Sequence, residues 1–268
     1  MWLLHGLGWL MGWLVFLLSP TYRRRFLANI QQAGLGWRQC RGAVGHTGRM
    51  VLELPRLWFG PPVRVHWAPG SEARLRAALD ARRGILMLTP HVGCFECIPQ
   101  EYARRFGAEQ AITVLYRPSR QPALSELVAS ARQREHLMTA PTTLAGVKQM
   151  LKALRAGQCV GLLPDQVPPR GLGVWAPFFG TPAYTMTLSA RLAQQTGAAI
   201  LLMRGERLSW GRGYRLHAQP LFGDGSQALP DDPVASATLI NQAMERLILS
   251  SPDQYLWGYS RYKQPRAE

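Results

Sequence analysis

The sequence predicts an α/β fold: a single domain with a mostly parallel central sheet flanked by helices, preceded by an N-terminal hydrophobic membrane-anchor helix. One observation is that short apolar runs alternate with helix-like segments from Pro61-Pro62 onwards. Another is an uncharged apolar run at residues 2–18. A third is the hydrophobic share of 47% in 268 residues, which provides a sizeable core and excludes a disordered chain. We expect an anchor at 1–20, a basic helical membrane-proximal segment at 21–60 and an α/β domain at 61–268.

The length of the apolar run at 2–18 is at the lower limit for a membrane-spanning helix. A secretory signal peptide would carry basic residues before the run and a small-residue cleavage site after it, whereas here Arg23–Arg25 follow the run. Tryptophans at 2, 9 and 13 are typical of the membrane interface. We expect an uncleaved anchor, spanning the bilayer or lying in its interface, with the rest of the chain on the cytoplasmic side; a buried core helix is the alternative.

The net charge of +15 is concentrated near the N-terminus, because residues 1–52 contain six arginines and no acidic residue. The stretch 21–58 has the pattern of one or two helices, broken near 34–36 and 42–48. Such a basic helical segment binds an anionic membrane surface or presents a solvated face. Four cysteines in this length exclude a disulfide-stapled scaffold.

In the body of the chain, the expected strands are short apolar runs bounded by turn residues, the pattern of strands in a buried parallel sheet. They lie at 85–89, 111–116, 136–139, 159–163, 199–203 and 214–218. The expected helices repeat apolar residues at helical spacing, and Gly157 ends the clearest of them. These helices lie at 95–106, 122–133, 142–156, 181–196 and 233–249.

Side chains able to do chemistry follow three of these strands, where parallel sheets bind ligands. His91 follows the first, with Glu96 five residues later, and a carboxylate beside an imidazole would let it act as a general base. A structural His–Glu pair is the alternative. Arg117 follows the second strand, next to Tyr116, and suits phosphate or carboxylate binding unless it is a surface arginine.

After the third strand come Asp165 and Gln166, which could orient a substrate or the surroundings of His91. An aromatic segment follows, and its Phe178 and Phe179 line an acyl groove or fill the core. The polar candidate site residues are therefore expected at one edge of the predicted sheet.

The sequence lacks the motifs of zinc sites, serine hydrolases, nucleotide-binding proteins and nucleic-acid-binding proteins. The pair Cys94-x-x-Cys97 resembles a redox pair or half a zinc site, but zinc needs a second ligand pair, and Cys40 and Cys159 stand alone, so we set aside both uses. The sequence contains no Gly-x-Ser-x-Gly, no P-loop and no dinucleotide-binding glycine motif before a suitable helix. It also lacks a recognisable nucleic-acid module. We therefore expect no metal, no cofactor and no nucleic-acid partner.

Four ordered motifs resemble those of the lipid A biosynthesis acyltransferases, the lauroyl and myristoyl transferases of the lysophospholipid acyltransferase superfamily. They are His-x4-Glu at His91 and Glu96, Tyr-Arg-Pro at 116–118, Asp-Gln with Gly-Val-x-x-Pro-Phe-Phe-Gly at 165–166 and 173–180, and a closing Gln-x-x-Trp-x-x-x-Arg-x-Lys at 254–263. Together with the apolar N-terminus they cover nearly the whole chain. Thr89-Pro90 and Phe95 depart from the residues usual beside the His-x4-Glu pair in that family.

The resemblance implies a membrane-associated acyltransferase at the cytoplasmic face of a bacterial inner membrane. His91 would be the general base, oriented by Glu96, and Arg117 would bind an acceptor phosphate. The remaining substrate-binding residues would be Thr89, Phe95, Tyr116, Asp165, Gln166, Phe178 and Phe179. The donor would be acyl carrier protein or acyl-CoA, and the acceptor a phosphorylated glycolipid, with no cofactor.

Two alternatives remain at this stage. The acceptor could be a lysophospholipid or an amino-acid lipid. From another class, the chain could be a non-catalytic, membrane-tethered basic protein that binds anionic lipid or nucleic acid.

Overall fold

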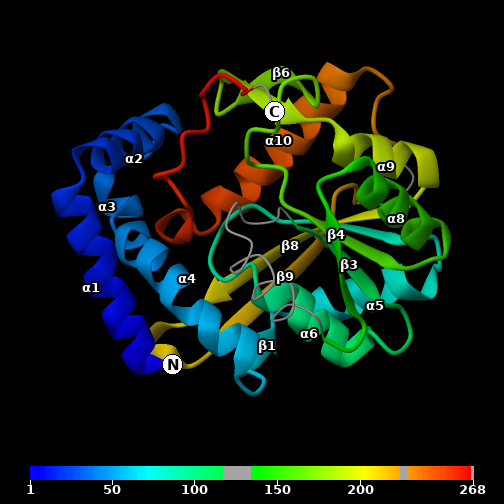
Figure 1. The fold of residues 1–268 in the computed structure, drawn as a ribbon, viewed down its shortest axis with the longest axis horizontal. Helices are drawn as coiled ribbons and strands as arrows, with labels where there is room; N and C mark the ends of the chain where they lie inside the picture. The colour runs from blue at the N-terminus through cyan, green and yellow to red at the C-terminus, as the bar shows by residue number, and fades with distance from the viewer. Residues whose placement is uncertain (117–133, 224–227, 267–268) are drawn as a thin grey trace.

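The computed structural model describes residues 1–116, 134–223 and 228–266. Its helices are α1 (Trp2–Leu18), α2 (Pro20–Gln32), α3 (Trp37–Cys40), α4 (Gly42–Phe59), α5 (Ser71–Asp80), α6 (Cys97–Phe106), α8 (Leu144–Arg155), α9 (Leu188–Thr196) and α10 (Pro233–Leu249), with two short 3-10 turns at Ser209–Gly211 and Pro252–Gln254. Its strands are β1 (Val65–Trp67), β2 (Ile85–Leu88), β3 (Ile112–Tyr116), β4 (Leu137–Pro141), β5 (Cys159–Leu162), β6 (Gly173–Phe178), β7 (Thr181–Met186), β8 (Ala199–Arg207) and β9 (Tyr214–Pro220). In Figure 1 the four N-terminal helices gather on one side of the molecule, beside the sheet.

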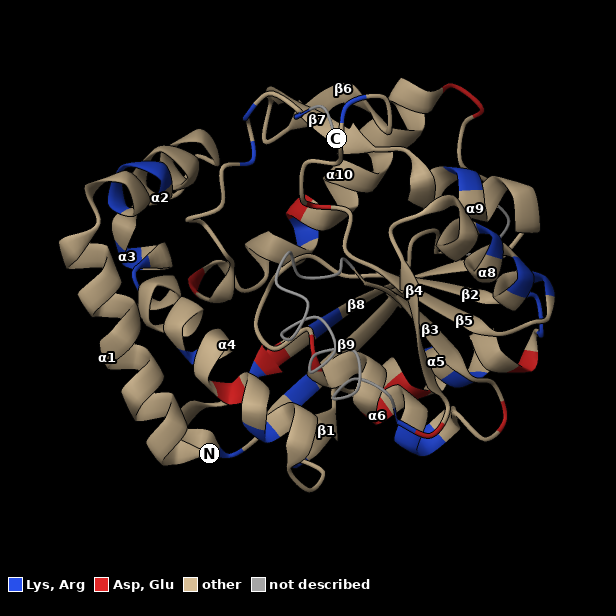
Figure 2. Cartoon of the chain, viewed as in Figure 1, with Lys and Arg blue, Asp and Glu red and all other residues tan. Residues whose placement is uncertain are grey.

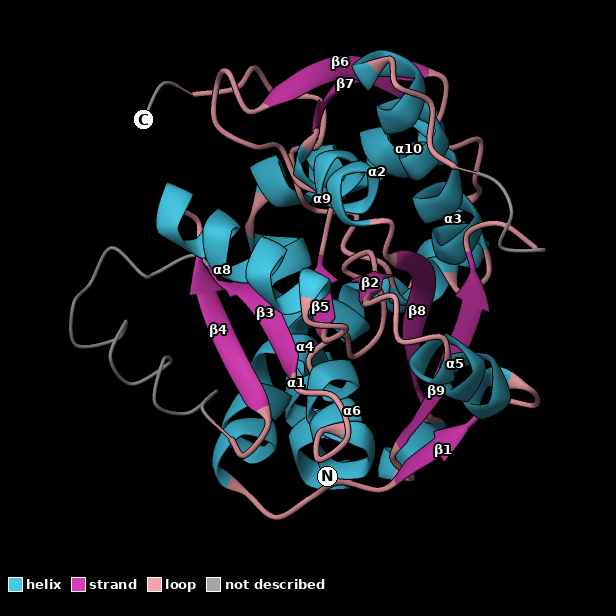
Figure 3. Ribbon diagram, turned by 90° about the vertical axis from the view of Figure 1, so that its right-hand side faces the viewer, coloured by secondary structure: helices cyan, strands magenta, loops and turns pink. Residues whose placement is uncertain are grey.

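The central sheet has seven strands in the order β1-β9-β8-β2-β5-β3-β4, and Figure 3 shows them side by side, from β4 to β1. The strands from β8 to β4 pair in parallel, whereas β9 is antiparallel to β8. The predicted α/β class with a mostly parallel sheet is therefore confirmed. One predicted helix, at residues 122–133, lies outside the described residues.

Both faces of the sheet are covered, which explains why its strands are apolar throughout. On β2, Leu86 and Leu88 belong to the core shared with α8, α9 and α10. Their neighbours Ile85 and Met87 belong to the core shared with α5 and α6. Alternate side chains of one strand thus enter two separate cores, as the pleat of a strand requires.

The prediction of a helix over 181–196 is wrong in its first half. Thr181–Met186 is strand β7, which pairs antiparallel with β6 as a separate two-stranded sheet. Phe179 and Gly180, the two residues between the paired Phe178 and Thr181, both have positive φ angles. Two such residues make the tight turn that matches the twist of a hairpin. The helix, α9, begins only at Leu188.

The predicted break near 42–48 is also wrong, because α4 runs straight through its glycines. Gly45 and Gly48 lie at the contact with α1, where Gly48 approaches Gly8 and, beside them, Gly12 approaches the carbonyl of Val44. The two helices have the most extensive contact of any pair of elements in the described chain. Small residues let helix backbones approach closely, so the glycines here serve packing and do not end the helix.

The outer face of α1 is apolar and exposed. Its buried side carries His5, Gly8, Gly12 and Phe16, and the opposite side presents a row of leucines to solvent: Leu3, Leu7, Leu10, Leu14, Leu17 and Leu18. Figure 2 shows α1 without any charged residue, next to α2 with its arginines. Among the described helices none alone is long and apolar enough to cross a bilayer; α1 and α2 meet that test only as a pair, and they are bent by 98°.

The close α1–α4 contact leads to a stability prediction for Gly48→Ala. An alanine in a helix is normally favoured over glycine by about 0.5–1 kcal/mol. At Gly48, however, the added Cβ would overlap the carbonyl oxygen of Gly8 and the backbone of Gly12. We expect the steric overlap to outweigh the helix preference of alanine. The free energy of unfolding, measured by urea unfolding in detergent, should then fall by about 1–3 kcal/mol.

The matched control is Gly6→Ala on α1, where a Cβ meets no atom within 4 Å. This variant should be as stable as the wild type or slightly more stable. If Gly48→Ala and Gly6→Ala behave alike, the close packing described for α1 and α4 is wrong.

Candidate active site

The loop that carries His91 is fixed by its backbone. Directly after β2 the chain turns at Gly93, whose φ of +59° and close approach to the carbonyl of Gly205 exclude a side chain. The amide of Gly93 donates to the carbonyl of Gln254 at 2.9 Å, and the amide of Cys94 donates to that of Gly205 at 2.7 Å. The loop is therefore held between β8 and the C-terminal segment.

His91 is bonded twice to Asp165. Its Nδ1 lies 2.7 Å from Asp165 Oδ1, and its backbone amide donates to Oδ2 at 2.9 Å. The two residues follow β2 and β5, which are adjacent and parallel, so the carboxyl ends of these strands bring them together. The Asp165 side chain is 2% exposed and that of His91 is 16% exposed, so the carboxylate is sealed while the imidazole reaches the surface.

The surroundings of Asp165 determine the tautomer of His91. Burial alone would raise the pKa of Asp165, but the nearby imidazole, its two hydrogen bonds and the Arg261 guanidinium outweigh burial and hold that pKa below its ordinary value. An ionised carboxylate only accepts hydrogen bonds, so Nδ1 carries the proton. The other ring nitrogen, Nε2, lies 3.1 Å from the side-chain nitrogen of Gln166 and accepts from it. Nε2 is thus the basic nitrogen.

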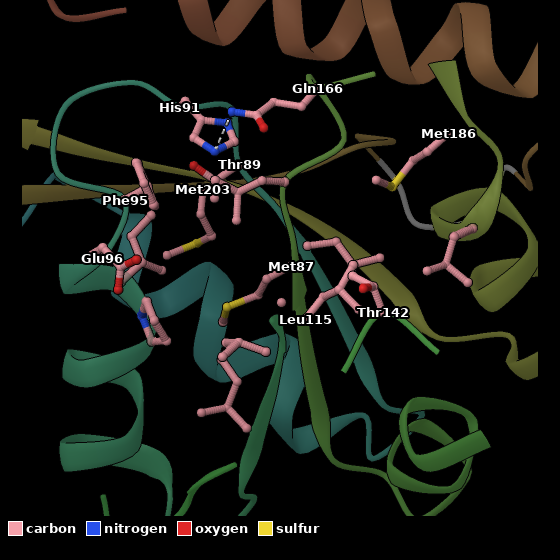
Figure 4. A pocket seen from close by; sticks show the side chains of 18 of the residues that line it. Met87, Thr89, His91, Phe95, Glu96, Leu115, Thr142, Gln166, Met186 and Met203 are labelled. Atoms are coloured by element: carbon pink, nitrogen blue, oxygen red, sulfur yellow. Dashed lines mark hydrogen bonds between the residues drawn. The ribbon is translucent and has the colours of Figure 1, made fainter. Parts of the chain in front are cut away.

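Glu96 does not take the position predicted for it. The hydrogen bonds of the His91 ring come from Asp165 and Gln166, so the orienting carboxylate is Asp165. Glu96 stands at the start of α6, where its Oε2 accepts a bond of 3.3 Å from Trp58 Nε1. Figure 4 shows Glu96 in the same cavity but apart from the His91 ring, beyond Phe95. The spacing of five residues could not show this, because α6 begins only at Cys97 and the intervening loop carries Glu96 away.

A cavity of about 450 Å³ opens beside His91. Thr89, Phe95, Glu96 and Gln166 line its polar mouth, and the Phe95 ring packs edge-on against the imidazole at 4.8 Å. The rest of its lining is mostly apolar, and Figure 4 shows Met87, Met203 and Leu115 there, with the polar Thr142 beside Leu115. Further apolar lining residues come from several strands and helices: Ile98, Ile112, Val114, Leu137, Val147, Leu162, Met186 and Leu188. A site of this size and lining is typical for a small apolar ligand.

The other predicted site residues are placed differently. Phe178 is buried beneath the Arg261 guanidinium at 4.9 Å, and Phe179 packs against Trp257. Both phenylalanines therefore pack in the core and the hairpin turn, and neither is among the residues that line the cavity beside His91. Tyr116 is buried at the end of β3. Arg117 lies outside the described residues.

Sequence reasoning missed most of the apolar cavity wall. Met87, Gly161 and Met203 belong to predicted strands, and their alternation along each strand could have assigned them to one face of the sheet. The cavity also takes Val147, Leu162 and Leu188 from the core on the other face of the sheet. Which side chains meet there depends on packing between elements distant in the sequence, which no local pattern encodes. Arg134 at the cavity wall donates to the carbonyls of Leu57 and Trp58 at the end of α4.

The cysteines form no bridge in the structure. Cys94 and Cys97 are free and buried, with the Cys97 thiol directed at the Cys94 carbonyl at 3.0 Å. Across residues 1–116, 134–223 and 228–266, no three or more His, Cys, Asp or Glu side chains are grouped so as to hold a metal ion.

Comparison with known proteins gives consistent matches. The family described as bacterial lipid A biosynthesis acyltransferase matches residues 41–264. The chain is 28% identical over 251 residues to a lipid A biosynthesis lauroyltransferase of Escherichia coli K12, covering 92% of this chain and 74% of that protein. It is also 28% identical over 221 residues to a lipid A biosynthesis palmitoleoyltransferase of the same organism, covering 81% and 68%.

The lowered pKa of Asp165 predicts how acid affects stability. A carboxyl group whose pKa is lower in the folded state stabilises the fold above its unfolded pKa, near 3.8 here, and loses that contribution as the pH falls through the folded value. The difference in unfolding free energy between the wild type and Asp165→Asn should therefore shrink as the pH falls from about 5 to about 3. Urea unfolding followed by tryptophan fluorescence measures it. A difference that stays constant over this range would contradict the assignment.

Proposed function

Because the chain belongs to the bacterial lipid A biosynthesis acyltransferase family, we propose that it transfers a fatty acyl chain from a thioester donor to a hydroxyl group of a lipid A precursor. The observation that carries the proposal is the position of His91, oriented by Asp165 at the mouth of an apolar cavity. A base beside an apolar cavity suits a reaction that joins a polar hydroxyl to an acyl chain.

The reaction needs a base that accepts a proton and then returns it. His91 Nε2 takes the proton of the acceptor hydroxyl as that oxygen attacks the thioester carbonyl. The tetrahedral intermediate then collapses, the carbon–sulfur bond breaks, and the thiolate leaves with the proton from the imidazolium. The products are an ester and a free thiol, so no acyl-enzyme and no cofactor are required. The acceptor hydroxyl would take the position that the Gln166 amide holds at Nε2.

The two carboxylates near His91 have different roles in this proposal. Asp165 fixes the tautomer through Nδ1 and stabilises the imidazolium directly. Glu96 lies in the wall of the same cavity and adds to the polar lining beside His91. Both form part of the catalytic group, but only Asp165 orients the ring.

The acyl chain would occupy the apolar depth of the cavity. Met87, Met203 and Leu115 lie below the mouth, where a chain attached to a carbonyl beside His91 would extend. A cavity of about 450 Å³ falls within the range for small-molecule sites, about 300–1,000 Å³. Thr89 and Phe95 would contact the acyl carbonyl end.

The positive charge of the chain fits the proposed substrates. A lipid A precursor carries phosphates, and we assign Arg117 to bind one of them, because a guanidinium holds phosphate through two parallel hydrogen bonds. Acyl carrier protein, an acidic protein, and acyl-CoA are both thioester donors that a basic surface attracts. We propose acyl carrier protein as the donor, with acyl-CoA as the alternative.

We also propose that the enzyme works at the cytoplasmic face of the inner membrane. The exposed leucines of α1 would enter the bilayer interface, while Arg23, Arg24 and Arg25 on α2 face the lipid phosphates. In this arrangement residues 1–20 act as the anchor, 21–60 as the membrane-proximal segment and 61–268 as the catalytic domain. The acceptor lipid then reaches His91 without leaving the membrane.

Substitutions in the catalytic group test the proposal. His91→Ala should lower kcat by about 10²–10⁴-fold, because it removes the base. Asp165→Asn should cause a loss of similar order, because an amide permits the wrong tautomer. Glu96→Gln should lower kcat less than Asp165→Asn. The measurement is transfer of labelled acyl groups from acyl carrier protein to a lipid A precursor.

The control for these variants is Glu109→Gln, a surface carboxylate paired with Arg76, which should leave kcat unchanged. Retained activity in His91→Ala would refute the catalytic proposal and favour a non-catalytic lipid-binding protein. A greater loss of kcat in Glu96→Gln than in Asp165→Asn would indicate that Glu96, and not Asp165, orients the ring.

The shape of the cavity predicts that substitutions at Gly161 change the preferred length of the acyl chain. Gly161 lies on β5 in the cavity wall, and a Cβ there meets only the Val114 and Ile112 side chains, the nearer at 3.2 Å. Larger residues in the series Gly161→Ala, Gly161→Val and Gly161→Leu should fill the cavity in steps. The preferred acyl chain should become shorter in the same order, as measured by competition between acyl carrier proteins of different chain length.

The control for this series is Leu144→Ala, an exposed position on α8, which should leave the chain-length preference unchanged. An unaltered preference across the Gly161 series would mean that the acyl chain binds elsewhere.

A further inference from the structure

A buried ion pair joins the N-terminal helices to the central sheet. Glu53 on α4 and Arg207 at the end of β8 are each 1% exposed at the side chain. Arg207 Nε donates to Glu53 Oε2 at 2.9 Å, and its Nη2 donates to the other carboxylate oxygen. The carboxylate also accepts from the Tyr214 hydroxyl at 2.9 Å and contacts His5 Nε2 on α1 at 3.1 Å. Both carboxylate oxygens of Glu53 therefore have hydrogen-bond partners in the interior.

Arg207 also reaches the loop that carries His91. Its Nη2 donates to the carbonyl of Gly93 at 3.1 Å. Its backbone amide and carbonyl are bonded to the Gln254 side chain at 2.9 and 3.1 Å, and the Gln254 carbonyl accepts from the Gly93 amide. The backbone amide and the backbone carbonyl of Gly93, two residues from the proposed base, are thus held by Gln254 and Arg207.

The stability of the fold does not explain this pair. Burying two charges costs several kcal/mol of solvation, and well-packed apolar residues of similar volume often serve stability as well or better. What apolar residues cannot supply is a directed hydrogen bond to the Gly93 carbonyl. A guanidinium, with donors in a rigid fork, can bond Glu53 and Gly93 together.

We propose that Glu53 and Arg207 are positioning residues that hold the Gly93 turn, and with it the His91 ring, in register with Asp165 and the cavity. The inference rests on the proposed function, since it concerns the geometry of the same base. Neither side chain lines the cavity among the described residues, so both act through the loop and not on the substrate. An error of about 1 Å in the position of a catalytic group lowers the rate by about 100-fold.

The test replaces both charges at once, in Glu53→Leu with Arg207→Met. This variant leaves no unpaired charge from the pair itself, but the buried Tyr214 hydroxyl and His5 Nε2 lose their carboxylate partner. It should therefore fold with a lowered melting temperature, and activity is measured well below that temperature. We expect kcat to fall by about 10–100-fold, while the KM values for donor and acceptor stay within about twofold, because the cavity is unchanged. The assay is acyl transfer by the full chain in detergent.

The matched control removes an ion pair that does not touch the loop. Glu101→Leu with Arg104→Met eliminates the pair on α6, in which Glu101 is also buried. Its kcat should stay within about twofold of the wild type. Wild-type kcat in the Glu53–Arg207 double variant, or an equal loss in the control, would overturn the inference.

A second variant covers the case in which the double variant fails to fold. Arg207→Lys keeps a positive charge beside Glu53, but its single ammonium cannot repeat the fork that reaches Gly93 as well. It should fold and show a reduced kcat with unchanged KM values, and full kcat in this variant would also overturn the inference. His91→Ala is run in parallel. Activity in His91→Ala refutes the proposed function itself, whereas an inactive His91→Ala beside a fully active Arg207→Lys refutes only the positioning role.

Discussion

The hydrogen bond from His91 Nδ1 to the buried Asp165 carboxylate is the interaction on which the account of this protein depends. It exists because β2 and β5 are adjacent and parallel, so that the residues after each strand meet at one edge of the sheet. It fixes the imidazole with its basic nitrogen facing outward. The second bond between the same residues, from the His91 amide, ties the loop backbone to the same carboxylate. The orientation of the ring and the path of the loop are thus set together.

The same edge of the sheet explains why the site is both polar and apolar. The loops after the strands supply His91, Asp165 and Gln166, while the strands and the helices around them supply the apolar wall. A long acyl chain and a hydroxyl group need opposite surroundings, and this edge provides them within one cavity. On the far side of the loop, Arg207 links it to α4 and, through Glu53, to His5 on α1. The helix with the exposed apolar face therefore contacts the hydrogen-bond network that reaches the His91 loop.

The sequence was sufficient for the fold class and for placing His91 and Asp165 at one edge of the sheet. Apolar runs bounded by Gly and Pro located the core strands, and the position of His91 and Asp165 after two of them placed both at the ligand-binding edge. The partnership between them could not be read, because it depends on which strands are neighbours. The spacing of His91 and Glu96 suggested a nearer carboxylate, but local spacing says nothing of the direction in which the loop turns.

The other differences have similar physical causes. The hairpin of β6 and β7 was missed because its turn is made by Phe179 with a positive φ angle, which a phenylalanine seldom adopts. The continuity of α4 was missed because Gly45 and Gly48 were interpreted as breaks, whereas contact with α1 requires them. The apolar cavity wall was missed because the depth of a cavity depends on packing between elements distant in the sequence.

The most direct test of the central claim is the protonation site of the His91 ring. Nitrogen NMR of the protein labelled at histidine, with the signal assigned by its loss in His91→Gln, distinguishes the two neutral tautomers. Neutral His91 should carry its proton on Nδ1 in the wild type and lose this preference in Asp165→Asn. A wild-type ring protonated on Nε2 would contradict it, because the nitrogen facing the cavity could not then act as the base.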